Sequence, residues 1–210
     1  MPPEAIPAAS TERKARTLGF SIIVRPMVLE DLEQVVAIDQ TSFSLPWPAH
    51  SFRYELLEND VARLWVAAAV SAAAETAEAV PTETVPAEAA PKVVGMIVVW
   101  LILDEAHIAT IAVLPEFRRL GIARKIMLTA LKECAAQGAK SATLEVRENN
   151  PNAIELYHKL GFEVVGRRKR YYKDTNEDAI LMTLEMKAPE KAQAAPEIPA
   201  GSNGGECESR

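Results

Sequence analysis

The segment from Arg118 to Ala123, which reads Arg-Arg-Leu-Gly-Ile-Ala, has the residue types of an anion-binding loop. It follows an apolar stretch, Ala106–Val113, and opens a stretch whose apolar residues recur at helical spacing, so it lies between a predicted buried strand and a predicted helix. Helix N-termini carry unpaired N–H donors and a partial positive charge, which together bind phosphate. Gly121 has no Cβ to hold an anion away from the backbone. The alternative is an ordinary strand–turn–helix whose arginines are only solvated.

A second group of reactive side chains accompanies the next predicted strand, Ala142–Val146. Glu145 lies in that strand, where glutamate is disfavoured, so its presence calls for an explanation. One explanation is a functional carboxylate; the other is a solvent-facing residue paired with Arg147 on the same face. Tyr157 follows on a short predicted helix, where the ordinary interpretation is a buried tyrosine with its hydroxyl at the edge. Asn150 is placed to cap that helix.

The predicted elements favour one α/β (α+β) domain over residues 20–187. Strands are predicted at 21–25, 64–70, 93–103, 106–113, 142–146, 162–172 and 179–187, and helices at 29–39, 49–57, 122–137 and 152–160. The strand at 142–146 is expected to run parallel to that at 106–113, because a helix connects them.

Three segments lack the composition of a packed core. Residues 1–19 and 188–210, rich in Ala, Pro, Gly and charge, are expected to be disordered tails. Residues 71–91, built almost wholly of Ala, Glu, Thr, Val and Pro, are expected to form a low-complexity insertion in a hairpin loop.

Composition excludes several classes of function. The net charge of -6 argues against binding nucleic acid by bulk electrostatics, and no apolar run is as long as a membrane span. Cys134 on an apolar helix face and Cys207 in a polar tail suggest neither a disulfide nor a metal site, and the three histidines are too scattered for zinc. We expect a cytoplasmic monomer without a metal, a membrane anchor or a nucleic-acid partner.

The motif R-x-x-G-x-A resembles the acyl-CoA pyrophosphate loop of the GNAT acetyltransferase superfamily. Within it the chain resembles the RimI-type N-terminal protein acetyltransferases, the ribosomal-protein-alanine branch, from about residue 20 to residue 187 apart from the insertion. The motifs that occur in family order are the loop Phe43–Pro48, the strand His107–Val113, the phosphate loop, Glu145-Val146-Arg147 and Tyr171-Tyr172. The resemblance implies a mixed, mostly antiparallel sheet with helices on both faces and splayed parallel strands at an acetyl-CoA cleft.

The resemblance also implies a reaction, direct transfer of acetyl from acetyl-CoA to a protein N-terminal amine. Glu145 would be the general base, acting through an ordered water because a carboxylate is a weak base beside an amine with a pKa of about 7.7–8.0. Tyr157 would protonate the departing CoA thiolate, since a phenol stays protonated at neutral pH. His107 matches a histidine that orders this water in archaeal relatives; the alternative is a solvent-facing residue at a strand end.

Binding residues follow from the same resemblance. Acetyl-CoA is expected to contact the backbone of one strand, the phosphate loop and the following helices, at Ile111, Ala112, Val113, Arg118, Arg119, Leu120, Gly121, Ile122, Ala123, Arg124, Asn150 and Tyr157. The acceptor peptide is expected between two walls that comprise Phe43, Leu45, Trp47, Glu145, Tyr171 and Tyr172. Core filling is the alternative for Phe43 and Trp47.

Other functions stay open at this point. A GNAT enzyme that acetylates a small amine or a lysine side chain differs only in its acceptor, and a non-catalytic acyl-CoA-binding module would use the acidic insertion to bind a partner. The run Arg167–Arg170 is interpreted as charge on an edge strand, which blocks aggregation; contact with a ribosome or an acidic peptide is the alternative.

Overall fold

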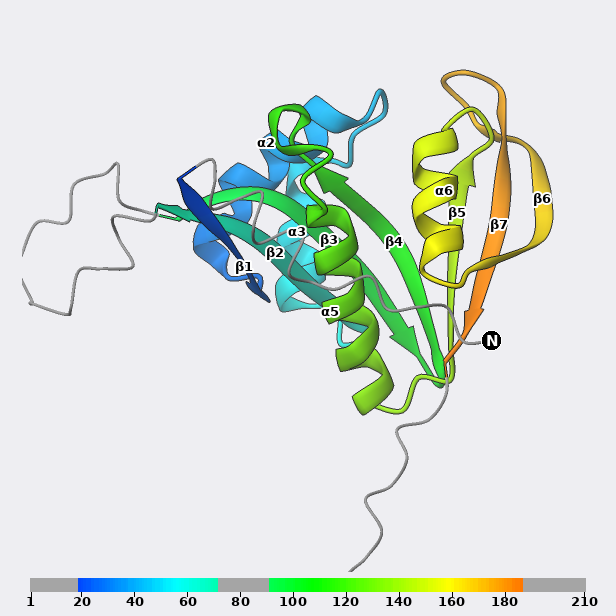
Figure 1. Cartoon of the computed structure of the whole chain (residues 1–210), viewed down its shortest axis with the longest axis horizontal. Helices are drawn as coiled ribbons and strands as arrows, with labels where there is room; N and C mark the ends of the chain where they lie inside the picture. The colour runs from blue at the N-terminus through cyan, green and yellow to red at the C-terminus, as the bar shows by residue number, and fades with distance from the viewer. Residues whose placement is uncertain (1–18, 72–90, 187–210) are drawn as a thin grey trace, which may run out of the picture.

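The computed structural model describes residues 19–71 and 91–186, which form one seven-stranded sheet in the order β1-β2-β3-β4-β5-β7-β6 (Figure 1). Neighbouring strands are antiparallel except for the central pair, β4 and β5. The predicted mixed, mostly antiparallel sheet is therefore confirmed. The strands are β1 (Phe20–Pro26), β2 (Ala62–Ser71), β3 (Lys92–Ile102), β4 (Glu105–Val113), β5 (Ser141–Arg147), β6 (Glu163–Tyr172) and β7 (Glu177–Glu185).

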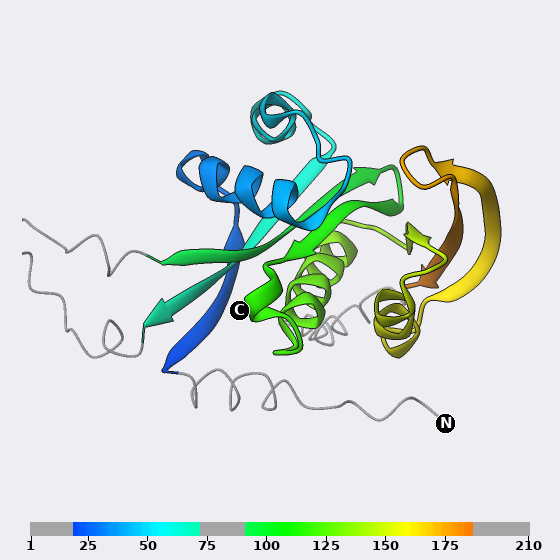
Figure 2. The same cartoon turned by 90° about the horizontal axis from the view of Figure 1, so that it is seen from above.

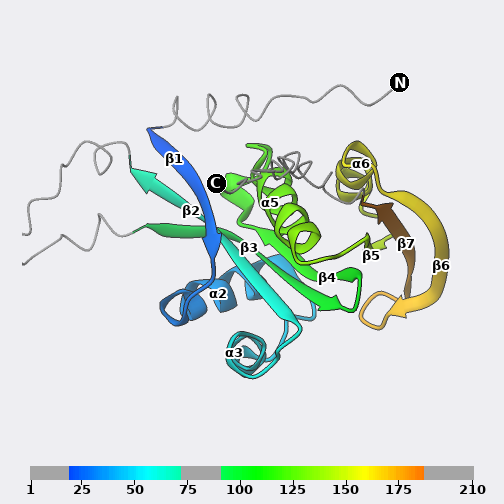
Figure 3. The same ribbon diagram turned by 90° about the horizontal axis from the view of Figure 1, so that it is seen from below.

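Four α-helices cover the two faces of the sheet, α2 and α3 on one side and α5 and α6 on the other (Figures 2 and 3). Two hydrophobic clusters correspond to these layers, one around α5 and one between the sheet and α2 and α3. The helix predicted at 29–39 is a 3-10 turn, η1, followed by α2, and a second 3-10 turn, η3, precedes α5. Their bounds are η1 (Leu29–Asp31), α2 (Leu32–Ser42), α3 (Ala49–Leu57), η3 (Pro115–Phe117), α5 (Ile122–Ala136) and α6 (Pro151–Lys159).

The predicted tails and insertion fall almost wholly outside the described residues. The strands that flank the insertion, β2 and β3, are antiparallel neighbours, and Ala69 of β2 lies opposite Lys92 of β3. These two strands are therefore arranged as a hairpin requires. Among the helices of residues 19–71 and 91–186, none is long and apolar enough to cross a membrane.

The parallel pair is short, and this places the site. β4 and β5 pair from Glu105 opposite Ser141 to Ile108 opposite Leu144, and beyond these residues the two strands diverge (Figure 1). The second half of β4 therefore has β3 as its only strand partner among the described residues. Glu145 is the first residue of β5 past the paired part.

Candidate active site

The predicted phosphate loop ends in a helix start with free donors. Gly121 is the N-cap of α5 and has a φ of +81°, a left-handed conformation that glycine adopts without steric cost. No side chain caps the helix, its first turn holds no acidic residue, and its first backbone bond runs from Lys125 N–H to Gly121 O. The N–H groups of the preceding residues, 122–124, thus have no acceptor within the helix.

The two arginines of the loop differ in role. Arg118 donates from Nε to the carbonyl oxygen of Val113 at 3.0 Å, so it ties the loop to the end of β4. Arg119 is exposed and has a φ of +64°, a strained conformation for a residue with a Cβ. The apolar residues after the two arginines pack against the core, namely Leu120, Ile122 and Ala123. Contacts of these residues to a ligand would therefore come from their backbone.

Glu145 and His107, both predicted to be catalytic, are brought together. Glu145 Oε2 lies 3.6 Å from His107 Nε2, and Arg168 Nη1 of β6 lies 3.0 Å from the other oxygen, Oε1. The Glu145 side chain is only 13% exposed. The alternative in which Glu145 pairs with Arg147 is wrong, because Arg147 binds Asp174. Arg168, interpreted from the sequence as surface charge, reaches this carboxylate.

His107 is the end of a stack of aromatic rings that includes Trp47 of the Phe43–Pro48 loop, the predicted substrate loop. Its ring lies 5.6 Å from that of Trp100, with 24° between the planes. Trp100 in turn stacks on Trp47 at 6.3 Å, and Trp47 on Phe52 at 5.3 Å. The buried carboxylate of Glu55 accepts a hydrogen bond of 2.8 Å from Trp100 Nε1–H, which fixes that ring. The substrate loop and His107 are therefore packed as one unit, and His107 is not a freely solvated strand end.

A buried aspartate, not singled out from the sequence, holds the same loop. Asp39 in α2 accepts a hydrogen bond of 2.7 Å from the backbone N–H of Trp47. Burial raises the pKa of Asp39, and the Trp47 bond opposes that rise. Within the loop, Phe43 is half-buried against the core beneath α2, whereas Leu45 is 60% exposed.

The tyrosines lie on the β6 and α6 side of the site. Tyr157 is buried in α6, and burial, followed by neighbouring Tyr172, raises the pKa of its hydroxyl. Burial also raises the pKa of Tyr172 to about 12, and its hydroxyl donates to the backbone oxygen of Glu145 at 3.4 Å. Tyr171 is 41% exposed and packs edge-on against Tyr172. Tyr157 and Tyr172 are thus protonated donors at neutral pH.

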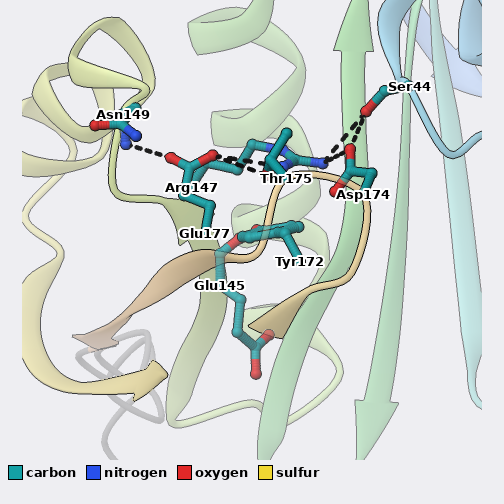
Figure 4. A network of polar contacts seen from close by, with 8 residues as sticks. All are labelled: Ser44, Glu145, Arg147, Asn149, Tyr172, Asp174, Thr175 and Glu177. Carbon is teal, nitrogen blue, oxygen red and sulfur yellow. Dashed lines mark hydrogen bonds and ion pairs between the residues drawn. The ribbon is translucent and has the colours of Figure 1, made fainter. Parts of the chain in front are cut away.

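A polar network joins the two predicted walls of the peptide site (Figure 4). Arg147 binds Asp174 at 2.7 Å and lies over the ring of Tyr172 at 4.0 Å. Asp174 also accepts a hydrogen bond from Ser44 of the substrate loop, and these two bonds, the Arg147 bond first, lower the pKa of Asp174 to about 2. Arg147 lies 3.5 Å from Glu177, which accepts from Asn149 N–H. The 43–48 loop and the β6–β7 turn are therefore linked through Arg147.

The remaining predicted cosubstrate residues flank the diverging strands. Ile111, Ala112 and Val113 form the end of β4, and Arg124 lies in the first turn of α5. Asn150 caps α6 as predicted, and its side-chain oxygen accepts from Ala153 N–H at 3.2 Å. Its side-chain NH₂ is not used by this cap.

The fold is that of an acetyltransferase of the GNAT family. The model of the Acetyltransferase (GNAT) family matches residues 32–162, most of the chain. The chain therefore belongs to the GNAT family, and the predicted family, fold and enzyme class are confirmed.

Individual relatives agree with that placement. A Bacillus subtilis (strain 168) protein provisionally named ribosomal protein bS18-alanine N-acetyltransferase is 35% identical over 163 residues, which are 78% of this chain and 95% of that protein. The crystal structure of the Escherichia coli ribosomal-protein-S18-alanine N-acetyltransferase superposes with a TM-score of 0.64 at 25% identity, over 83% of this chain and 99% of that one. Arabidopsis thaliana NAA60, solved with acetyl-CoA, shares the fold with a TM-score of 0.63 at 18% identity, over 79% and 99% of the two chains.

Proposed function

We propose that this protein transfers the acetyl group of acetyl-CoA to the N-terminal α-amine of a protein, with an N-terminal alanine of a ribosomal protein as the favoured acceptor. The acceptor class rests on the relatives from B. subtilis and E. coli, whose names state that activity. The observation in this chain that carries the proposal is the position of Glu145, a mostly buried carboxylate at the point where β4 and β5 diverge.

The reaction forms a C–N bond and breaks the C–S bond of the thioester. Glu145 accepts a proton from the α-ammonium through a water, because direct transfer to a carboxylate is poorly matched, and the neutral amine that results has the lone pair that attacks the thioester carbonyl. Tyr157 donates its proton to the departing thiolate, and its burial keeps that proton in place at neutral pH. No covalent enzyme intermediate is needed: Cys134 is buried in α5, where burial raises the pKa of its thiol to about 11.

The diphosphate of acetyl-CoA is held at the start of α5. The free N–H groups of residues 122–124 and the left-handed Gly121 provide close backbone donors, and Arg119 adds an exposed positive charge. Backbone N–H groups near Ile111 and Val113 hold the pantetheine and the acetyl carbonyl, and they stabilise the oxyanion that develops on attack. The NH₂ group of Asn150, free of the helix cap, is available to the pantetheine.

The acceptor peptide lies between the 43–48 loop and the strand end that carries Tyr171 and Tyr172. The bond between Ser44 and Asp174 supports this placement, because it holds the two walls next to each other. Exposed Leu45 and Tyr171 supply apolar surface for side chains of the peptide, and the hydroxyl of Tyr171 can donate to an extended peptide backbone.

The experiment is an acetylation assay on three acceptors with one readout. The full chain is incubated with acetyl-CoA and one acceptor at a time. The three acceptors are a peptide that has a free N-terminal alanine, a lysine peptide with a blocked N-terminus, and a polyamine. We expect mass spectrometry to place the acetyl group on the alanine α-amine. Preferential modification of the lysine or the polyamine would replace the proposed acceptor with a side chain or a small amine. Coenzyme binding without transfer to any of the three, or to a pool of protein N-termini, would indicate a non-catalytic module.

A further inference from the structure

Behind His107 runs a short chain of hydrogen bonds that leads away from Glu145. His107 Nδ1 lies 3.2 Å from Thr143 Oγ1, and the Thr143 hydroxyl lies 2.9 Å from Glu105 Oε1. The strand register builds this chain, because His107 is directly opposite Thr143 in the parallel pair and Glu105 is two residues before His107 on the same face of β4. Glu105 is exposed, so the chain ends in solvent.

This chain determines which nitrogen of the neutral His107 ring carries the proton. An ionised carboxylate only accepts hydrogen bonds, so the single hydroxyl proton of Thr143 is given to Glu105. The hydroxyl oxygen can then only accept from His107, and Nδ1 must be the donor. The neutral imidazole has one proton, so Nε2, the nitrogen that faces Glu145, carries a lone pair.

We propose that Thr143 and Glu105 are positioning residues that hold His107 in the Nδ1–H form, so that His107 Nε2 and Glu145 Oε2 together accept hydrogen bonds from the water that takes up the proton of the incoming α-ammonium. This inference rests on the proposed function for the identity of the ammonium. At 3.6 Å the two acceptors are too far apart for a hydrogen bond with each other and close enough to share one water, which has two O–H bonds to donate.

The opposite tautomer would remove one of the two acceptors. A proton on Nε2 would face Glu145 Oε2, and Nε2 would then have no lone pair with which to accept a hydrogen bond from the water. The other groups around the pair do not replace the relay. Arg168 binds the far oxygen of Glu145, and Trp100 covers a face of the imidazole with its own N–H directed to Glu55. Among the described residues, Thr143 is the hydrogen-bond partner of Nδ1.

The tautomer is measured directly by 15N NMR of the histidine side chains in the full chain, at a pH where the rings are neutral. The chain has three histidines, and a His107→Gln variant assigns the signals. His158 provides an internal reference, because its Nδ1 lies 3.1 Å from the carbonyl oxygen of Phe162, which can only accept. We expect His107 to show the Nδ1–H pattern of His158. Thr143→Val and Glu105→Ala should each shift His107 towards Nε2–H.

Two controls separate positioning from mere support of the fold. Thr143→Ser keeps a hydroxyl and should keep the Nδ1–H form, and Asp104→Ala removes the neighbouring carboxylate, which pairs with Lys140 and not with Thr143. With an alanine peptide, Thr143→Val should lower kcat by about 10–100-fold, the range for loss of a group that orients a histidine, and Thr143→Ser should restore it.

The inference is overturned if His107 carries its proton on Nε2 in the unaltered chain, or if either Thr143→Val or Glu105→Ala leaves the tautomer as it was. The NMR result does not depend on acetyl transfer. A chain that acetylates nothing but shows the expected tautomers would therefore refute the proposed function and leave the relay in place.

Discussion

Glu145 Oε2 lies 3.6 Å from His107 Nε2, and this contact joins the first residue of β5 past the paired part to a residue of β4 that is still paired, one before the last paired residue, Ile108. The sheet therefore separates its two central strands at the residue that carries the carboxylate. In the proposed function an acceptor amine that enters there meets Glu145 and His107 from two different strands. The end of β4 leads through η3 to the start of α5, where the proposed diphosphate site lies (Figure 1).

Replacing Glu145 with Gln keeps the size of the side chain and removes its basicity. We expect kcat for the alanine peptide to fall by about 100-fold or more, the usual contribution of a general base, while the Kd for acetyl-CoA stays within about twofold. Steady-state kinetics and calorimetry measure the two quantities. Comparable losses in both would contradict a role in proton transfer.

Tyr157→Phe removes the proposed proton donor and preserves the buried ring. We expect kcat to fall by about 100-fold, since the thiolate would then leave without an acid. Because burial raises the pKa of Tyr157, the unaltered enzyme should show no loss of rate from its ionisation up to about pH 10, the ordinary value for tyrosine. Tyr54→Phe, at an exposed position in α3, is the control. An unaffected rate in Tyr157→Phe would remove this residue from the mechanism.

Arg168 binds Oε1 of Glu145 and so presents Oε2 to His107. Arg168→Gln should lower kcat by about 2–5-fold, a small effect because the arginine is half-exposed and such ion pairs are weak. Added salt should bring the unaltered enzyme towards the rate of the variant, since it screens the pair. Arg167→Gln is the matched control, because Arg167 binds Glu148 and not Glu145. Equal effects of the two substitutions would contradict the orienting role.

The network at Asp174 gives a stability that depends on pH. The pKa of this aspartate is about 2 in the folded chain, against about 3.9 when unfolded. Because the folded value is the lower one, ionised Asp174 stabilises the fold at neutral pH, and this contribution is lost as the pH falls from about 4 to about 2. The free energy of unfolding of Asp174→Asn should therefore decline less steeply than that of the unaltered chain over this interval. Urea unfolding at several pH values measures both slopes, and parallel curves would refute the assignment.

The sequence predicts most of the fold, because its signals are local. The apolar run of β4, the cap at Asn150 and the glycine at the start of α5 each specify an element from neighbouring residues. The order of strands in the sheet cannot be predicted in this way. Strand β7 inserts between β5 and β6, and no local pattern in the sequence specifies that insertion.

Several contacts between elements were not predicted, and their sequence separation explains why. Ser44 and Asp174, 130 residues apart, meet only because the β6–β7 turn folds over to the loop after α2. Arg168 was interpreted as surface charge because β6 is an edge strand, as it proved to be. Shifts of register between Val164 and Gly166 and between Arg168 and Tyr172 break the two-residue alternation, so the direction of Arg168 does not follow from the pattern. The roles assigned to the individual site residues remain predictions.

The most direct test of the account is the binding of coenzyme A to the start of α5. Gly121 and Gly138 lie at the two ends of that helix, and both have a left-handed backbone, with φ values of +81° and +103°. Substitution of either by Ala brings similar backbone strain, but only Gly121 lies at the free N–H groups. Circular dichroism first establishes that both variants fold.

Calorimetry then measures the Kd for coenzyme A in the unaltered chain and in the two variants. We expect Gly121→Ala to weaken binding by about tenfold or more, equivalent to about 1.4 kcal/mol, and Gly138→Ala to bind as the unaltered chain does. The difference in affinity between the Gly121→Ala variant and the unaltered chain should vanish when pantetheine, which has no diphosphate, replaces coenzyme A. Failure of the unaltered chain to bind coenzyme A, or equal affinities in both glycine variants, would contradict the account.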